Sequence, residues 1–187
     1  MSTHTQELVE LLDREKIRDC LARLARGEDR RNAELITGAY WPCALIDHGI
    51  FTGTFDEYLA WVVPGSPDIP LTQHVLGQSL IDLYADTALV ETHVLAYHHV
   101  ATADEHRDTV IGGRYLDWME KIGSEWRIAR RTMLYDWYQD LGASVDWTTG
   151  LMGMPSDTEG YAGRAVGDPS EQILGDRWTP EMGDAAE

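Results

Sequence analysis

The spacing of apolar residues separates a helical N-terminal part of the chain from a later part that has the pattern of long strands. Apolar residues recur every three or four positions from Leu8 to Leu24, which predicts a helix over about residues 5–26. A shorter helix is predicted over residues 32–39, and Pro42 prevents its continuation. The chain therefore begins with helices.

A short hairpin and a third helix are predicted next. The segment ALIDHGIF, residues 44–51, is typical of two short strands that turn near Gly49. Thr54 is the predicted N-cap of a helix over residues 55–63, which ends at Pro64.

From residue 71 onward the apolar pattern predicts four long strands joined by short turns. They cover about residues 71–84, 87–102, 108–122 and 125–139. Helices followed by an antiparallel meander indicate the α+β class. We expect a cone-shaped α+β barrel, in which the helices pack in a curved antiparallel sheet and leave an interior pocket.

The last 47 residues have a different composition from the rest of the chain. Residues 141–187 hold eight glycines, three prolines and nine acidic residues against two arginines. We therefore predict one barrel domain over residues 1–140 and an acidic extension over residues 141–187. Its apolar side chains predict that it packs on its own barrel mouth or on that of a neighbouring copy.

Composition and charge restrict the partners. The net charge of −17 disfavours nucleic acid and anionic membrane surfaces. No apolar run is long enough to span a membrane, and the N-terminus does not resemble a signal peptide, so we expect a cytoplasmic protein. Seven tryptophans and eight tyrosines against two phenylalanines suit an aromatic or polycyclic small molecule.

Two residues are the leading candidates for chemistry. Asp29 follows the first predicted helix in ARGEDRRN, and His74 lies in the first long strand in LTQHVLGQ. Each has an ordinary structural interpretation, as a helix N-cap and as a satisfied core histidine. In a helix-on-sheet cone, however, the two can meet inside the pocket, where a carboxylate beside an imidazole fixes its tautomer and raises its basicity. That arrangement suits proton abstraction.

The chain resembles the SnoaL-like members of the nuclear transport factor 2-like superfamily over roughly residues 5–139. The stretches that carry the resemblance are IRDCLARLARGEDRR, WPCALIDHGIFTG, TQHVLG, VIGGRYLDWMEK and EWRIARRTMLYDW. The resemblance implies a cone-shaped fold and, in many members, a His/Asp dyad that works without metal or organic cofactor. Its activities include polyketide cyclisation, dehydration, dehydrochlorination and expulsion of formaldehyde from lignin-derived diaryl compounds.

The family residues match particular positions of this sequence. The resemblance implies that Asp29 and His74 form the dyad, that Arg131 stabilises the carboxylate or a developing negative charge, and that Tyr115 lines the pocket. Scytalone-type dehydratases carry a second histidine on the next strand, where this sequence has the adjacent His98 and His99. The tyrosine that those dehydratases place before the aspartate is absent here, where Glu28 precedes Asp29.

Other residues are assigned by position. A strand sends alternate side chains inward, so either His98 or His99 faces the pocket, and we expect His98 to do so. Tyr40, Tyr58 and Trp61 are expected to contact the substrate, although Tyr58 and Trp61 also suit a plain core. We interpret Asp47-His48 as turn-forming residues.

No metal site is expected. The spacing of His93, His98, His99 and His106 fits no helical metal motif, and His93 and His99 lie about 20 Å apart on an extended strand. Cys20 and Cys43 have no metal-type spacing, and we expect reduced thiols.

Three classes of function remain open from the sequence. The leading hypothesis is a cofactor-independent lyase in which His74, oriented by Asp29, removes a proton and water, halide or formaldehyde departs. The second is an isomerase or an aldol-type cyclase, which begins with the same proton transfer. The third is a non-catalytic small subunit of a ring-hydroxylating dioxygenase or a ligand-binding module. Apolar residues on both faces of the strand over residues 87–102 also predict a homo-oligomer. The family resemblance favours a trimer.

Overall fold

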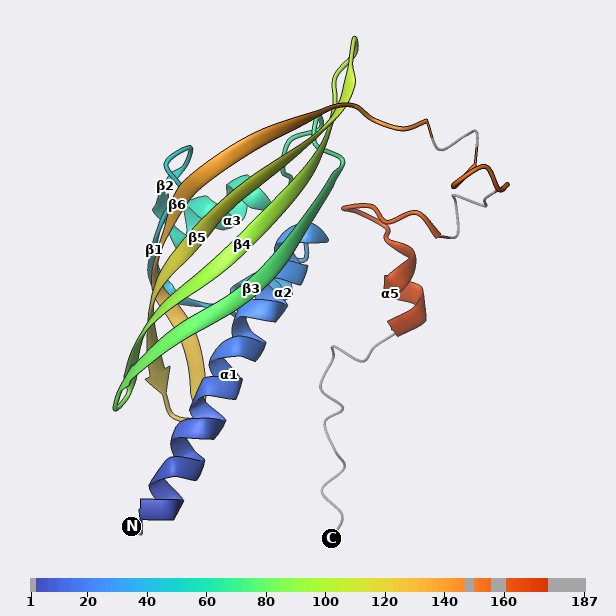
Figure 1. Ribbon diagram of the computed structural model, residues 1–187. Coiled ribbons are helices and arrows are strands. Elements are labelled where there is room, and N and C mark those ends of the chain that lie inside the picture. Colours follow the sequence, from blue (N-terminus) through green and yellow to red (C-terminus); the bar gives the residue numbers. More distant parts are fainter. Residues whose placement is uncertain (1–2, 147–149, 156–160, 175–187) are drawn as a thin grey trace, which may run out of the picture.

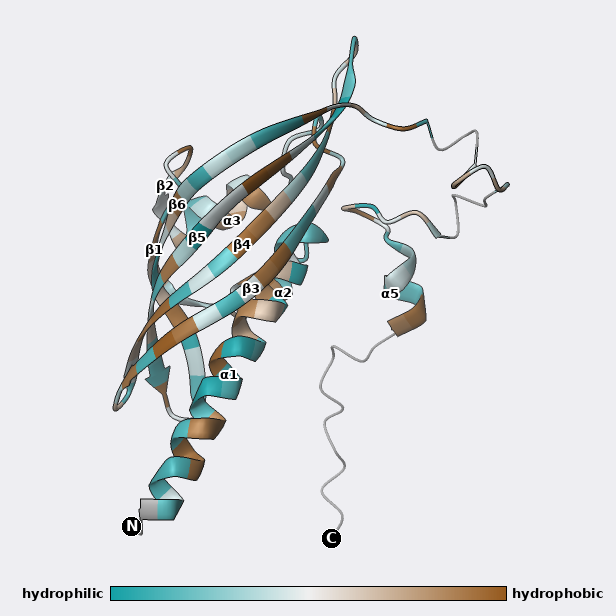
Figure 2. Cartoon of the chain, viewed as in Figure 1, coloured by the Kyte–Doolittle hydropathy of each residue, from teal (hydrophilic) through white to brown (hydrophobic). Residues whose placement is uncertain are grey.

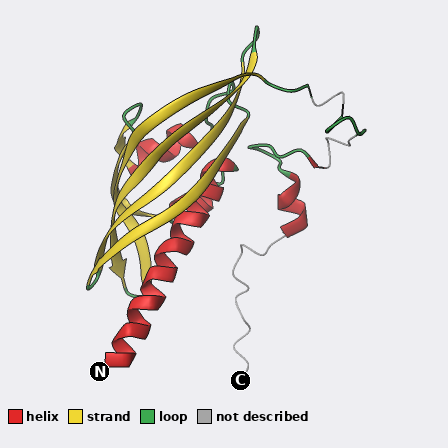
Figure 3. Cartoon of the chain, viewed as in Figure 1, coloured by secondary structure: helices red, strands yellow, loops and turns green. Residues whose placement is uncertain are grey.

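One curved sheet wraps around the N-terminal helices in the computed structural model, which describes residues 3–146, 150–155 and 161–174 (Figures 1 and 3). The helices are α1 (Thr3–Asp29), α2 (Ala33–Thr37), α3 (Phe55–Val62) and α5 (Pro169–Leu174). The strands are β1 (Tyr40–Asp47), β2 (Thr52–Thr54), β3 (Leu71–Tyr84), β4 (Thr87–Ala101), β5 (His106–Ile122) and β6 (Glu125–Ala143). The prediction of an α+β cone is confirmed.

The strand order is β2-β1-β6-β5-β4-β3. The four long strands β3 to β6 form the predicted antiparallel meander. The predicted hairpin is present as β1 and β2, and Gly49 in its turn has a φ of 73°, which glycine adopts without steric cost. The sheet is nevertheless mixed, because β1 runs parallel to β6.

The short helix after α1 is shorter than the sequence predicts. It ends at Thr37, and β1 already begins at Tyr40, so Pro42 lies inside a strand and not after a helix. The register between β1 and β6 is irregular between Tyr40 and Leu45, which is where a strand tolerates a residue without a backbone N–H.

The second half of α1 supplies one side of the core. Ile17, Cys20, Leu21 and Leu24 recur at helical spacing and are fully or almost fully buried against the sheet and α2. Burial of a side chain of this size contributes about 1.5–3 kcal/mol. Asp13, one turn earlier, is also buried and is satisfied by bonds from the side chains of Lys121 and Trp126.

The first turns of α1 have a different environment. Leu8, Leu11 and Leu12 continue the same apolar period but are 48%, 54% and 60% exposed. Figure 2 shows this apolar part of α1 extending beyond the sheet. Within the described residues, no helix is both long and apolar enough to cross a membrane.

The end of the barrel and the beginning of the extension differ slightly from prediction. The boundary at residue 140 falls inside β6, which ends at Ala143. Part of the extension packs on the barrel: Ala165 is buried, and its N–H donates to the carbonyl of Pro70, just before β3.

Candidate active site

A pocket of about 230 Å³ lies inside the cone, where α3 and the end of α1 face the concave side of the sheet. Its lining residues come from α1, the β1–β2 turn, α3, the loop before β3 and all four long strands. They include Glu28, Arg31, His48, Ile50, Tyr58, Trp61, Ile69, Thr72, His74, His98, Ile111, Tyr115, Met133 and Tyr135. The walls are therefore mainly aromatic and aliphatic, with a few polar groups among them.

Asp29 and His74 meet as the sequence predicts. Asp29 is the last residue of α1, and its carboxylate lies 2.7 Å from Nδ1 of His74. The same carboxylate accepts hydrogen bonds from the backbone N–H of His74, at 2.9 Å, and from the hydroxyl of Thr72, at 3.1 Å. Asp29 thus bonds to three groups of β3, which fixes the position of its carboxylate relative to the strand.

This geometry favours one tautomer of the neutral His74 ring. With Nδ1–H donated to Asp29, the lone pair of Nε2 is the basic site of the neutral ring. Burial lowers the pKa of His74, but the hydrogen bond to Asp29 and the charges of Glu28 and Asp29 outweigh burial, so the pKa lies above its ordinary value. His74 is therefore a stronger base than a free imidazole.

Glu28 places a second carboxylate at the pocket. It is buried, and its Oε1 accepts a hydrogen bond of 2.6 Å from the hydroxyl of Tyr58. Burial and the charge of Glu28 raise the pKa of Tyr58 well above its ordinary value, so this tyrosine stays a donor. Tyr58 is thus a pocket residue, as predicted, and its ring stacks edge-on against the core residue Tyr40 at 5.7 Å.

Arg131 lies behind the pocket wall. Its guanidinium makes two hydrogen bonds with Asp117, of 2.7 and 2.8 Å, and is 4.0 Å from the ring centroid of Tyr115. The side chains of Arg131 and Asp117 are 2% and 0% exposed. Tyr115 lines the pocket as predicted, but it separates Arg131 from the cavity, and Asp117 already neutralises that charge. Arg131 is therefore placed to support Tyr115 and not to contact a substrate directly.

The remaining predicted pocket residues divide into two groups. His98 lines the pocket and His99 does not, because alternate residues of β4 face opposite sides; His99 bonds to Asp108 and Ser144 instead. Trp61 also lines the pocket, stacked on Phe51. Tyr40 is not among the lining residues and is buried in the core, so the expected contact with a substrate does not fit this placement.

His48 is a pocket residue that sequence reasoning assigned to the turn. The turn interpretation holds for Asp47, which accepts a hydrogen bond from the N–H of Gly49. The His48 ring instead turns inward, 5.3 Å from the ring of Tyr58 and 6.0 Å from that of Tyr115, and its Nε2 is buried without a protein partner. Burial, with Arg131 and His74 nearby, lowers the pKa of His48 to about 3, so the ring is neutral.

Metal-binding residues do not gather in the described part of the chain: no group of three or more His, Cys, Asp or Glu side chains there could hold a metal ion. Cys20 is buried and Cys43 exposed, and both are free thiols.

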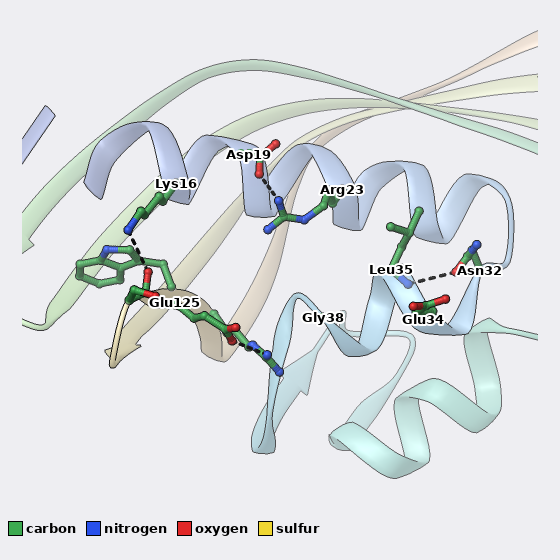
Figure 4. A pocket seen from close by; sticks show the side chains of 11 residues that line it. Lys16, Asp19, Arg23, Asn32, Glu34, Leu35, Gly38 and Glu125 are labelled. Carbon is green, nitrogen blue, oxygen red and sulfur yellow. Dashed lines mark hydrogen bonds and ion pairs between the residues drawn. The ribbon is translucent and has the colours of Figure 1, made fainter. Parts of the chain in front are cut away.

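A larger hollow of about 580 Å³ lies outside the cone, between α1, α2 and the β5–β6 turn (Figure 4). Most of its charged side chains already have protein partners: Arg23 pairs with Asp19, Arg127 pairs with Glu125, and Lys16 bonds to the carbonyl of Ser124. It contains no histidine, so the interior pocket is the better candidate for proton transfer.

The comparisons with known proteins agree with this fold. The model of the SnoaL-like domain matches residues 9–132, more than half of the chain. The chain belongs to the SnoaL-like domain family. No curated protein matches the sequence significantly.

Solved structures similar to this SnoaL-like chain share its fold at low sequence identity. The hexachlorocyclohexane dehydrochlorinase LinA-type3 from Novosphingobium barchaimii is 18% identical with a TM-score of 0.65, and the match covers 75% of this chain and 99% of that one. A scytalone dehydratase-like protein from Novosphingobium aromaticivorans is 20% identical, with a TM-score of 0.63 and coverages of 73% and 92%. A nuclear transport factor 2-like superfamily protein from Salmonella enterica is 14% identical, with a TM-score of 0.58 and coverages of 73% and 96%.

Proposed function

We propose that this protein is a lyase that requires no cofactor and acts on an uncharged aromatic molecule. The observation that carries the proposal is the 2.7 Å contact between Nδ1 of His74 and the Asp29 carboxylate at the edge of a mainly apolar pocket inside the cone. Neighbouring folds named as a dehydrochlorinase and a scytalone dehydratase-like protein support an elimination.

In the proposed reaction, Nε2 of His74 takes a proton from a carbon of the substrate. The electrons of that C–H bond form a double bond to the neighbouring carbon, and the leaving group departs with the electrons of its own bond. Asp29 stabilises the imidazolium that forms, which then returns its proton to a departing hydroxide or to solvent. In a C–C-cleaving version the proton comes from a hydroxymethyl O–H, and the electrons of that O–H bond form the C=O bond of formaldehyde. The electrons of the broken C–C bond then form the double bond to the neighbouring carbon, as the leaving group departs with the electrons of its own bond. A positioned base of this kind contributes about 10²–10⁴-fold in rate.

The charges around the pocket support an uncharged substrate. Its two nearest guanidinium groups are committed to the protein: Arg131 to Asp117, and Arg31 to the backbone carbonyls of Ser66 and Ile69, at 3.1 and 2.6 Å. The carboxylates of Glu28 and Asp29 would repel an acid. A carboxylate substrate would therefore meet two carboxylates in the pocket, while the N–H groups of Arg31 are already engaged by backbone carbonyls.

The size of the pocket and its polar groups restrict the class of substrate further. An apolar cavity of about 150 Å³ holds benzene, so 230 Å³ accommodates a core of one or two rings. The unpartnered Nε2 of His48 and the neutral ring of His98 provide hydrogen bonds for hydroxyl or carbonyl groups. We infer that the substrate is a phenol or ketone with one or two rings and a leaving group next to an acidic C–H or O–H.

A panel of such compounds, incubated with the protein in D₂O and followed by NMR, tests the proposal. Elimination should appear as release of the leaving group, and an isomerase or cyclase would instead incorporate deuterium without release. His74→Gln and Asp29→Asn should abolish the reaction while costing about 1–2 kcal/mol of stability or less.

The matched control is His99→Gln. His99 also pairs with a carboxylate, that of Asp108 at 3.0 Å, but it lies on the other side of β4, away from the pocket. Its variant should keep full activity. Turnover that survives in His74→Gln, or that is lost equally in His99→Gln, would contradict the proposed role of the dyad.

A further inference from the structure

The described part of the C-terminal extension contacts the two elements that carry the dyad. Ala165 is buried, and its N–H donates a hydrogen bond of 3.2 Å to the carbonyl of Pro70, next to the first residue of β3. Three residues later, Asp168 reaches the end of α1, where its Oδ2 lies 3.2 Å from Nε of Arg30. One short segment therefore connects the end of α1 with the beginning of β3.

Asp168 is built into this contact. Its side chain is only 5% exposed, although it is an acidic residue in an acidic extension. It accepts hydrogen bonds of 2.9 Å from the backbone N–H groups of Arg164 and Ser170, and the Ser170 hydroxyl also bonds to it. Ser170 in turn accepts a hydrogen bond of 3.0 Å from Nη2 of Arg26, one turn before the end of α1. A buried carboxylate with this many partners holds a fixed geometry.

The contact lies beside a hollow that is open to solvent. This hollow of about 300 Å³ follows the seam between α1 and β3, and Arg26, Asp29, Arg30 and His74 are among its lining residues. Across this seam, Asp29 is bonded directly to β3 through Thr72 and His74. The extension adds a second connection between the same two elements.

We propose that residues 163–170 form a clamp that fixes Asp29 against His74 by tying the end of α1 to the beginning of β3. Arg30 directly follows Asp29, and Pro70 lies four residues before His74 on an extended segment, so a displacement of either anchor moves one partner of the dyad. Asp168 and Arg30 are positioning residues in this scheme, and neither lines the interior pocket. Residues 163–170 lie beyond the matched SnoaL-like region, which ends at residue 132. The proposal rests on the proposed function only for its effect on turnover.

The test compares Asp168→Asn with Glu171→Gln in the full-length chain. Both variants remove one carboxylate charge from the same part of the extension, but Glu171 is exposed and Asp168 is buried. The readout that needs no substrate is the pKa of His74, followed by NMR of ¹³C-labelled histidine and assigned with His74→Gln. A neighbouring carboxylate such as Asp29 shifts the pKa of a histidine by about 1–3 units. If loss of the clamp lets Asp29 move away from His74, the pKa of His74 should fall by about one unit in Asp168→Asn. Glu171→Gln should leave it unchanged.

Turnover supplies a second readout. Since a displacement of about 1 Å can cost 10²-fold in rate, we expect kcat to fall on the order of ten- to a hundredfold in Asp168→Asn with little change in KM. Arg30→Gln should have the same effect, and the double variant should lose no more than either single variant. Asp168→Glu should recover part of the activity.

The possible outcomes test the clamp separately from the proposed lyase function. An unchanged pKa of His74 in a folded Asp168→Asn protein would overturn the clamp, whatever its activity. If that variant does not fold, Ser170→Ala, which removes only the hydroxyl contacts to Asp168 and Arg26, takes its place with the same criterion. A protein without lyase activity whose His74 pKa falls as expected would refute the proposed function and leave the clamp supported.

Discussion

Removal of the Asp117 carboxylate should destabilise the protein more than any change to a surface ion pair. Asp117→Asn leaves the Arg131 guanidinium buried without its bidentate partner, and the nearest remaining carboxylate oxygen, that of Glu28, is 4.0 Å away. Breaking a buried pair by removing one partner costs about 3–5 kcal/mol. Because Glu28 partly compensates, we expect about 3 kcal/mol, a large share of the roughly 5–15 kcal/mol that stabilises a typical domain.

Urea denaturation measures this loss. With a typical slope of about 2 kcal/mol per molar urea, the midpoint should fall by about 1.5 M. The chain provides its own control, because Arg114 and Asp136 form a second bidentate pair between the same two strands, with bonds of 3.1 Å, on the solvent-exposed side. Asp136→Asn should leave the midpoint almost unchanged, since solvent screens exposed pairs.

A double replacement separates charge from packing. Arg131→Met with Asp117→Leu removes both charges and keeps most of the volume, so it should recover most of the lost stability. Midpoints of Asp117→Asn and Asp136→Asn that agree within error would refute the reasoning.

Further predictions concern the pocket and the assembly. The rate constant kcat/KM should rise with pH to a plateau, because His74 must be neutral to act. The midpoint should lie above 6.5, since Asp29 and Glu28 raise the pKa of His74 against the effect of burial. In Asp29→Asn the midpoint of any residual activity should fall. His48→Phe removes an unpaired buried nitrogen, so thermal melts should show equal or higher stability while KM rises about tenfold or more, and a lower melting temperature with unchanged KM would contradict this. Dialysis against a strong chelator should leave activity intact, and activity lost there but restored by one divalent ion would show a metal requirement. Sedimentation should give a mass well above 21.1 kDa, with a trimer favoured, and a clean monomer would rule out the oligomer.

Periodicity predicted most of the fold because each element has a simple repeat and a clear end. The four long strands appear within a few residues of their expected bounds. The parallel pairing of β1 with β6 was not predictable, since it joins residues about 85 positions apart and leaves no local signal. The apolar period of α1 also begins at Leu8, yet only the later turns reach the core. The local pattern of apolar residues predicts which face of a helix is apolar. It does not predict how far along the helix the sheet extends to cover that face.

The contact between Asp29 and His74 was predictable, whereas the surrounding residues were only partly so. It follows from the places of the two residues at a helix end and in the first long strand, together with the family resemblance. Alternation along β4 left His98 and His99 open, and the structure turns His98 inward. The His48 side chain points inward because of the turn that Asp47 and Gly49 form. The sequence pattern predicts that turn but does not predict the direction of the side chain between its two residues.

The end of α1 restricts where new substrate specificity can arise. Glu28 and Asp29, the last two residues of α1, point about 100° apart and reach Tyr58 and His74. The turn residues Arg30 and Arg31 follow directly and reach the extension and the loop before β3. An insertion of one residue would therefore misdirect four connections at once. The β1–β2 turn supplies Ile50 and His48 to the pocket through a few local bonds, so a library of variants aimed at altered substrate range should diversify this turn and keep the helix end constant.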